Sequence, residues 1–238
     1  MCRSLFLLLA GSFLMLSAHA QKTIIKDPNA EVRPAKGFHG IEVSNAINLY
    51  LSQGEEEAVV VSASDPKWRE YIHTDVVDGI LKITLDTHKW SRGNIKIKAY
   101  VSFTTLDRLS ASGASDVFVD GVITGDNFSV DLNGASDFKG AINVKDFRLE
   151  QSGASDAHVT GAVSGLADIR SSGASDVKGY DLTIRNCNIH ASGASDIRIT
   201  VSNELNADLS GASTVFYKGD AIVRDVRSSG ASVVKKSS

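Results

Sequence analysis

The chain has 238 residues, of which 42% are hydrophobic, 22% charged and 7% aromatic, which is enough for one or two compact domains with a core. This composition argues against disordered, collagen-like and coiled-coil proteins. The net charge of -3 leaves no basic surplus to neutralise a phosphate backbone, so nucleic acid is not expected as a partner. Twenty glycines against three prolines favour strands and turns.

Residues 1–20 have the pattern of a secretory signal peptide. A single arginine precedes a short apolar stretch that ends in Ala18-His19-Ala20, the small-x-small sequence that signal peptidase recognises. We expect cleavage after Ala20 and export to the periplasm, the outer surface or the medium. The alternative is a retained anchor, but the apolar stretch is interrupted and short for a bilayer span. No membrane span is expected after cleavage.

The next two segments precede the repeats. Residues 21–37 are expected to be a flexible lead-in, and residues 38–110 a strand-rich N-terminal cap region. Asp65 and Pro66 predict a short helix over 67–72, with the aspartate as its cap. Because an open end of a repeat array exposes unpaired strand groups, we expect this region to cover the first turn or to continue it irregularly. Strands are predicted at 41–43, 47–51, 59–61, 80–85 and 95–103.

Residues 111–238 contain a tripeptide repeat. Its period is near 20 residues, with spacings of 21, 19, 20, 20, 18 and 19. The preceding residue is Ser in six copies and Asn133 in the other, and the following residue is Asp in five. A unit this short cannot bury its apolar residues alone, so the copies must stack on one another. The seven Gly-Ala-Ser copies begin at Gly113, Gly134, Gly153, Gly173, Gly193, Gly211 and Gly230.

When the copies are aligned on their glycines, the position four residues before each Gly is always apolar and both of its neighbours are polar. The position four residues after each Gly is apolar as well. A period of two is typical of half-buried strands, so each copy predicts two short strands joined by a corner. We expect Gly to supply the corner's backbone conformation and Ala to fill its inner angle, so that Ala174→Leu unfolds the stack locally.

The predicted fold is therefore all-β: a parallel β-solenoid, or β-helix, of about seven rungs behind an irregular cap, with equivalent strands about 4.8 Å apart. An antiparallel sandwich is the alternative. Its hairpins would not bring every corner into one line or give every turn the same chemistry.

The Ser-Gly-Ala-Ser-Asp corner, behind a signal peptide and a strand-rich stretch such as Gly40-Ile41-Glu42-Val43-Ser44, resembles an exported family common in Bacteroidetes. That family is described as "putative auto-transporter adhesin, head GIN domain". The resemblance covers about residues 38–236. It implies a β-solenoid envelope protein and supplies no catalytic residues to carry over. The chain contains no Gly-Ile-Asn tripeptide.

The aspartates of the corners are the candidate metal ligands, because solenoids can bind calcium between turns through Asp. Two residues further on, four of the five copies carry a basic or titratable side chain, and Asp can also bond the amides of the turn. We therefore favour a structural role and no cofactor, with calcium as the alternative. The five residues are Asp116, Asp137, Asp156, Asp176 and Asp196.

No catalytic or cofactor-binding site is predicted. A uniform aspartate ladder lacks the two carboxylates of separated acidity that a glycosidase needs. The histidines lack metal-ligand spacing, and Cys187 falls in an apolar column, where burial is expected. Trp68, Tyr71 and Trp90 are candidate glycan-binding residues, with core packing as the alternative role of the tryptophans.

We expect a non-enzymatic, exported cell-envelope protein, an adhesin or surface interaction module that presents a rigid repeat face to a protein or glycan. One alternative is a carbohydrate-binding or carbohydrate-active module that uses the N-terminal aromatics. The other is a purely structural envelope component.

Overall fold

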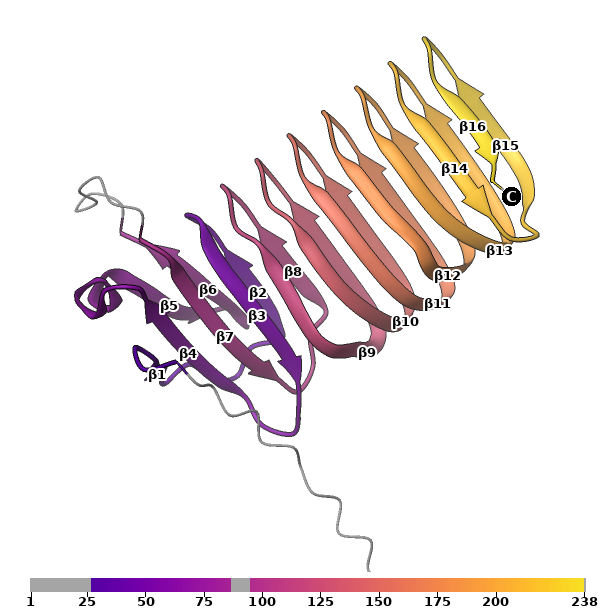
Figure 1. Cartoon of the computed structure of the whole chain (residues 1–238). Helices are drawn as coiled ribbons and strands as arrows, with labels where there is room; N and C mark the ends of the chain where they lie inside the picture. Colours follow the sequence, from indigo (N-terminus) through magenta and orange to yellow (C-terminus); the bar gives the residue numbers. More distant parts are fainter. Residues whose placement is uncertain (1–26, 87–94, 238) are drawn as a thin grey trace, which may run out of the picture.

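The computed structural model describes residues 27–86 and 95–237. The predicted signal peptide, Trp90 and His88 lie outside the described residues. Bent strands are stacked one above another along the molecule, and their sharp corners form a row along one edge of the stack (Figure 1). The strands belong to one continuous sheet that wraps around the core.

Parallel pairing between successive turns builds the solenoid. Leu149 on β10 lies opposite Ile169 on β11, which lies opposite Ile189 on β12. This ladder confirms the parallel solenoid and excludes the sandwich. The repeat strands are β8 (Arg108–Ala111), β9 (Val117–Leu132), β10 (Phe138–Gln151), β11 (Asp156–Ser171), β12 (Asp176–Ala191), β13 (Asp196–Leu209), β14 (Thr214–Lys218), β15 (Ile222–Ser228) and β16 (Val233–Lys236).

Each long strand bends once between corners, near the register shifts of its ladder, such as that between Val144 and Phe147. The halves that follow the corners form the first face of the solenoid, and the halves that precede them form the second face. The apolar columns predicted from the sequence point into the core between the two faces. Val226 is the exception at 42% exposure, because no described strand stacks on β15. The buried members of its column are Leu109, Val130, Leu149, Ile169, Ile189 and Ala207.

The glycines of the corners lie in a single row. Gly173 has φ +84°, and a Cβ added there would meet the carbonyl oxygen of Gly153 at 2.3 Å. The amide of Ala174 donates to that same oxygen at 2.8 Å. Each corner therefore sits directly on the backbone of the corner before it, which leaves no room for a side chain.

The inner residue of the corner is the serine. Ser175 is fully buried and Ala174 is exposed, so the expectation that Ala fills the inner angle is wrong. The Ser175 hydroxyl donates to the carbonyl of Ser172 at 3.0 Å and accepts the amide of Ser155 at 3.4 Å. A buried corner carbonyl needs a donor, which a methyl group cannot supply. Ala174→Leu is accordingly not expected to unfold the stack.

Two further turns come from the N-terminal region, and their order in the stack differs from their order in the chain. The strand pair β2–β3 stacks directly on β8 and β9, and the pair β6–β7 stacks on its other side. The corner between β2 and β3 has no glycine. Asn45 and Ala46 adopt φ values of 67° and 58° there. The four strands are β2 (Gly40–Val43), β3 (Ile47–Gln53), β6 (Ile80–Leu85) and β7 (Ile97–Phe103).

Antiparallel strands cover the N-terminal end of the stack. β4 (Ala58–Ala63) pairs with β7, β5 (Ile72–Val77) pairs with β6, and β1 (Glu31–Arg33), which lies within the expected lead-in, pairs with β4. The predicted short helix is the 3-10 helix η1 (Pro66–Tyr71) between β4 and β5. As expected, the Asp65 side chain caps it by accepting the amide of Lys67 at 3.2 Å.

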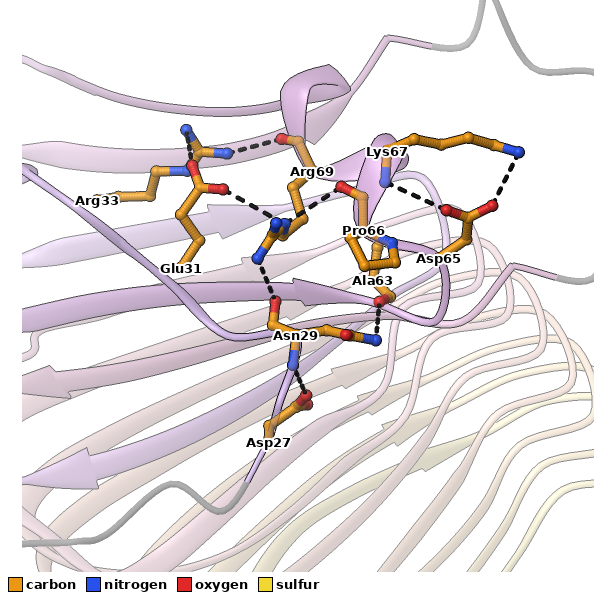
Figure 2. Close-up of polar contacts among 9 residues, drawn as sticks. All are labelled: Asp27, Asn29, Glu31, Arg33, Ala63, Asp65, Pro66, Lys67 and Arg69. Carbon is orange, nitrogen blue, oxygen red and sulfur yellow. Dashed lines mark hydrogen bonds and ion pairs between the residues drawn. The ribbon is translucent and has the colours of Figure 1, made fainter.

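A polar network centred on Arg69 ties β1 to η1 (Figure 2). The Arg69 guanidinium donates to the Asn29 carbonyl at 3.1 Å and lies 3.3 Å from the Glu31 carboxylate. Arg33 donates to the Arg69 carbonyl at 2.6 Å and pairs with Glu31 at 3.0 Å. The segment before β2 is thereby fixed against the covered end of the solenoid.

Candidate binding surfaces

The aspartates predicted as candidate metal ligands form a ladder on the first face. Asp156, Asp176 and Asp196 lie in register on neighbouring strands. Partial burial raises the pKa of Asp116, and the charge of Asp137 adds to this effect. The ladder is therefore a run of like charges that repel one another.

Basic side chains two residues further along the same face offset part of this repulsion. Lys178 reaches back to Asp156 at 3.0 Å, and Arg198 pairs with Asp196 on its own strand. The Asp137 carboxylate accepts the amide of Asp156 at 3.2 Å. Across residues 27–86 and 95–237, no three His, Cys, Asp or Glu side chains are grouped so that they could hold a metal. The structural role of the ladder stays a prediction, with calcium binding as its alternative.

On the first face, the basic column that includes Lys178 and Arg198 continues toward the cap as a stack of aromatic rings. The rings of Tyr50 and Tyr100 stack at 5.1 Å, and those of Tyr50 and Phe118 at 5.3 Å. Tyr50 and Tyr100 were not among the candidate binding residues predicted from the sequence. Tyr50 stands five residues after Asn45, just as Phe118 stands five residues after Gly113, so aligning the glycine-free corner would have revealed its place.

Of the N-terminal aromatics predicted as glycan ligands, Trp68 and Tyr71 belong to η1 in the cap. Trp68 is 8% exposed and belongs to the hydrophobic core, with its ring tilted against that of Tyr71 at 5.4 Å. The exposed ammonium of Lys67 lies 5.8 Å from the centre of the indole. A buried indole offers little surface for a sugar to stack on.

Cys187 is buried in the core at 1% exposure, as its column predicted. Burial raises the pKa of its thiol well above the ordinary value. The thiolate needed for nucleophilic attack is therefore not formed at neutral pH.

His158 on the first face and His190 on the second are both exposed.

A hollow lies on the second face, where the strands approach the corners. This hollow, the second-face groove, has a volume of about 480 Å³ and crosses five strands from β9 to β13. Its lining is polar except for Ala191. It consists of the outward side chains Asp131, Glu150, Arg170, His190 and Asp208, the corner residues Asn133, Ser152, Ser172, Ser192 and Ser210, and the deeper residues Gln151, Ser171 and Ala191.

Acidic and basic side chains are matched at the β9 end of this groove. Arg108 lies 3.6 Å from Asp131, and Glu150 is paired with Arg148 and, at 3.7 Å, with Arg170. Burial raises the pKa of Asp131, the charge of Arg108 opposes this rise, and the charge of Glu150 adds to it. At the other end, the side chains of His190 and Asp208, which lie opposite one another on β12 and β13, have no hydrogen-bond or ion-pair partner among the described residues.

Two polar side chains on the inner side of the sheet have unused hydrogen-bonding capacity. Gln151 and Ser171 are each 3% exposed and lie opposite one another on β10 and β11. The Gln151 amide nitrogen donates to the Ser155 carbonyl at 2.9 Å, whereas Gln151 Oε1 and Ser171 Oγ have no partner among the residues described. Because they stand two residues after the inward Leu149 and Ile169, both side chains point into the core and not into the groove.

A family model described as "Putative auto-transporter adhesin, head GIN domain" matches residues 37–221. The chain belongs to this family. The resemblance deduced from the repeated corner is thereby confirmed. No curated protein is similar enough to the chain to count as a relative.

Solved structures share the fold. A protein from Bacteroides fragilis described as a putative adhesin superimposes with a TM-score of 0.82 at 20% identity, covering 87% of this chain and 96% of its own. One from Parabacteroides distasonis, described as a putative lipid binding protein, gives 0.69 at 17% identity, covering 89% and 98%. A putative adhesin from Parabacteroides merdae gives 0.61 at 16% identity, covering 88% and 95%. At these identities the likeness establishes the solenoid and nothing about ligands.

Within the part of the chain that the structure describes, no helix has the length and apolarity needed to span a membrane.

Proposed function

We propose that this protein is a non-enzymatic, exported cell-envelope module that holds a protein or glycan against a rigid repeat face. The observation that carries the proposal is the register of the outward side chains. On the second face, Glu150, Arg170 and His190 follow one another on adjacent strands without a shift. A partner that bridges several strands can therefore make many weak contacts that add together.

The carboxyl pair of the groove supports binding over catalysis. A retaining glycosidase needs its two carboxyl groups about 5 Å apart, with the sugar between them. Asp131 and Glu150 lie opposite one another on adjacent strands, Arg108 lies 3.6 Å from Asp131, and Arg148 pairs with Glu150. Both carboxyl groups are therefore engaged in ion pairs, which favours a binding role.

Adhesion of the producing bacterium tests this function. A strain lacking the gene should attach less to immobilised host and bacterial surface extracts than its parent, and added purified protein should compete with the parent for those surfaces. Fractionation with surface proteolysis should place the protein in the envelope. Unchanged attachment of the deletion strain, together with no binding of the purified protein to either extract, would overturn the proposal.

A further inference from the structure

We propose that the second-face groove binds a linear, uncharged glycan lying along the axis of the solenoid. This inference rests on the proposed function and names the ligand class of its binding face. The ligand class is identified from the shape of the groove, from the chemistry of its lining and from the pairing of its charges.

The shape requires an extended ligand. From Asp131 on β9 to Asp208 on β13 the groove takes four steps between strands, about 19 Å at about 4.8 Å per step. A second hollow of about 240 Å³ shares His190 and Asp208 with it and continues to Arg227 on β15. A compact metabolite would fill only part of this length, whereas a linear polymer can lie along all of it.

The lining favours hydroxyl groups over apolar side chains. Peptides are usually held by an open strand edge or by pockets for alternate side chains, and the groove runs across the face of paired strands with Ala191 as its only apolar lining residue. Its carboxylates, guanidinium, amides and serine hydroxyls include both donors and acceptors. A sugar hydroxyl can use both kinds of group at once.

The charge pattern favours a ligand without charge. Arg108, Arg148 and Arg170 are already paired with carboxylates along the β9 end. An anionic or cationic polymer would have to displace these pairs or lie beside a like charge, which costs free energy. Neutral hydroxyls can hydrogen-bond to the pairs without breaking them.

The test measures binding of the purified protein to immobilised linear glucans, mannans and xylans of increasing length, with heparin and a peptide array beside them. At least one neutral glycan should bind, with affinity that rises with chain length until the groove is filled. The double variant His190→Ala with Asp208→Asn should weaken that binding at least tenfold. Neither side chain has a contact that the fold needs, so this variant should keep the parent melting temperature.

The matched control lies on the first face. His158→Ala with Asp120→Asn removes the same two kinds of exposed side chain and should leave the affinity unchanged. The inference is overturned if no neutral glycan binds, if only heparin or peptides bind, or if the control variant weakens binding as much as the groove variant. If the deletion strain loses adhesion and expression of the groove variant restores it, the glycan site is refuted and the adhesive function is still supported.

Discussion

At the scale of single residues, the corner depends on the absence of a side chain at one position and on a hydroxyl at another. A Cβ at Gly173 would lie 2.3 Å from the Gly153 carbonyl oxygen, and φ is +84°. Backbone strain and the clash act together there, because the oxygen belongs to rigid backbone and cannot move aside. Ser175 satisfies the carbonyl that the turn buries.

We therefore expect Gly173→Ala to destabilise the protein by about 3 kcal/mol or more. Gly125 is the control, since a Cβ there meets nothing within 4 Å, and Gly125→Ala should stay within about 0.5 kcal/mol of the parent. Urea unfolding followed by circular dichroism measures both. Similar losses for the two variants would show that the corners are not in van der Waals contact.

The aspartate ladder makes stability depend on pH. Burial and the charge of Asp137 raise the pKa of Asp116 above 3.8, so the folded state holds this proton more tightly than the unfolded chain does. Ionisation of Asp116 therefore costs stability as pH rises through its folded pKa, and stability is recovered when pH falls below the unfolded value.

Asp116→Asn should accordingly raise the melting temperature at pH 7, and the gain should vanish near pH 3, where Asp116 is protonated in both states. Asp120→Asn, at an exposed site four residues further along the chain, should leave the melting temperature unchanged at both pH values. Calorimetric scans at the two pH values make the comparison. An equal gain at both would mean that the charge of Asp116 is not what opposes folding.

At the scale of elements, the cap is held by polar contacts around Arg69 as well as by strand pairing. Its guanidinium contacts Asn29 in the segment before β1, Glu31 in β1 and Pro66 in η1. Contacts in a solenoid reach only neighbouring turns. Loss of Arg69 should therefore loosen this end and leave distant strands intact.

Arg69→Ala should remove about 2 kcal/mol of local stability, which corresponds to about 30-fold faster amide exchange in β1 and η1, with β11 and β12 unchanged. Lys67→Ala removes an exposed ion pair with Asp65, at 2.8 Å, and the contact of the exposed Lys67 ammonium with the Trp68 ring, and should have a small effect. Hydrogen exchange read by mass spectrometry resolves the segments. Uniform acceleration along the whole chain would contradict local capping.

The same elements define what the sequence could predict. Alternation around Leu149 and Ile169 identified the strands, their inward faces and their parallel stacking, because the side-chain period reports burial directly. It could not reveal that β6 and β7 stack on β2 and β3, because alternation shows which side chains are buried but not which strands are paired.

The groove shows a similar limit. Glu150 and Arg170 were recognisable as outward polar residues, yet the hollow between them and the corner depends on how sharply the strands bend. The corner at Asn45 was missed because its residues carry no glycine and adopt positive φ all the same. The inward position of the corner serine was not predicted, because the carbonyl that it satisfies is buried by the backbone geometry of the turn.

At the scale of the whole molecule, stability is a sum over turns and the contacts between neighbours. The turns are nearly interchangeable, because every corner rests on the one before it and every inward column repeats. A change of length by one complete turn preserves these relations. A change by half a turn places first-face residues on the second face and breaks the row of corners.

Removal of residues 174–193 joins Gly173 directly to Ala194, and β11 then stacks on β13. The shortened protein should fold, unfold at a lower urea concentration because one interface between turns is lost, and be shorter along its axis by about 4.8 Å. Removal of residues 174–183 alone should prevent folding, since β11 would meet a turn without its first-face half. Small-angle scattering and circular dichroism distinguish the two products, and a half-turn deletion as well folded as the full-turn deletion would refute the stacking of equivalent corners.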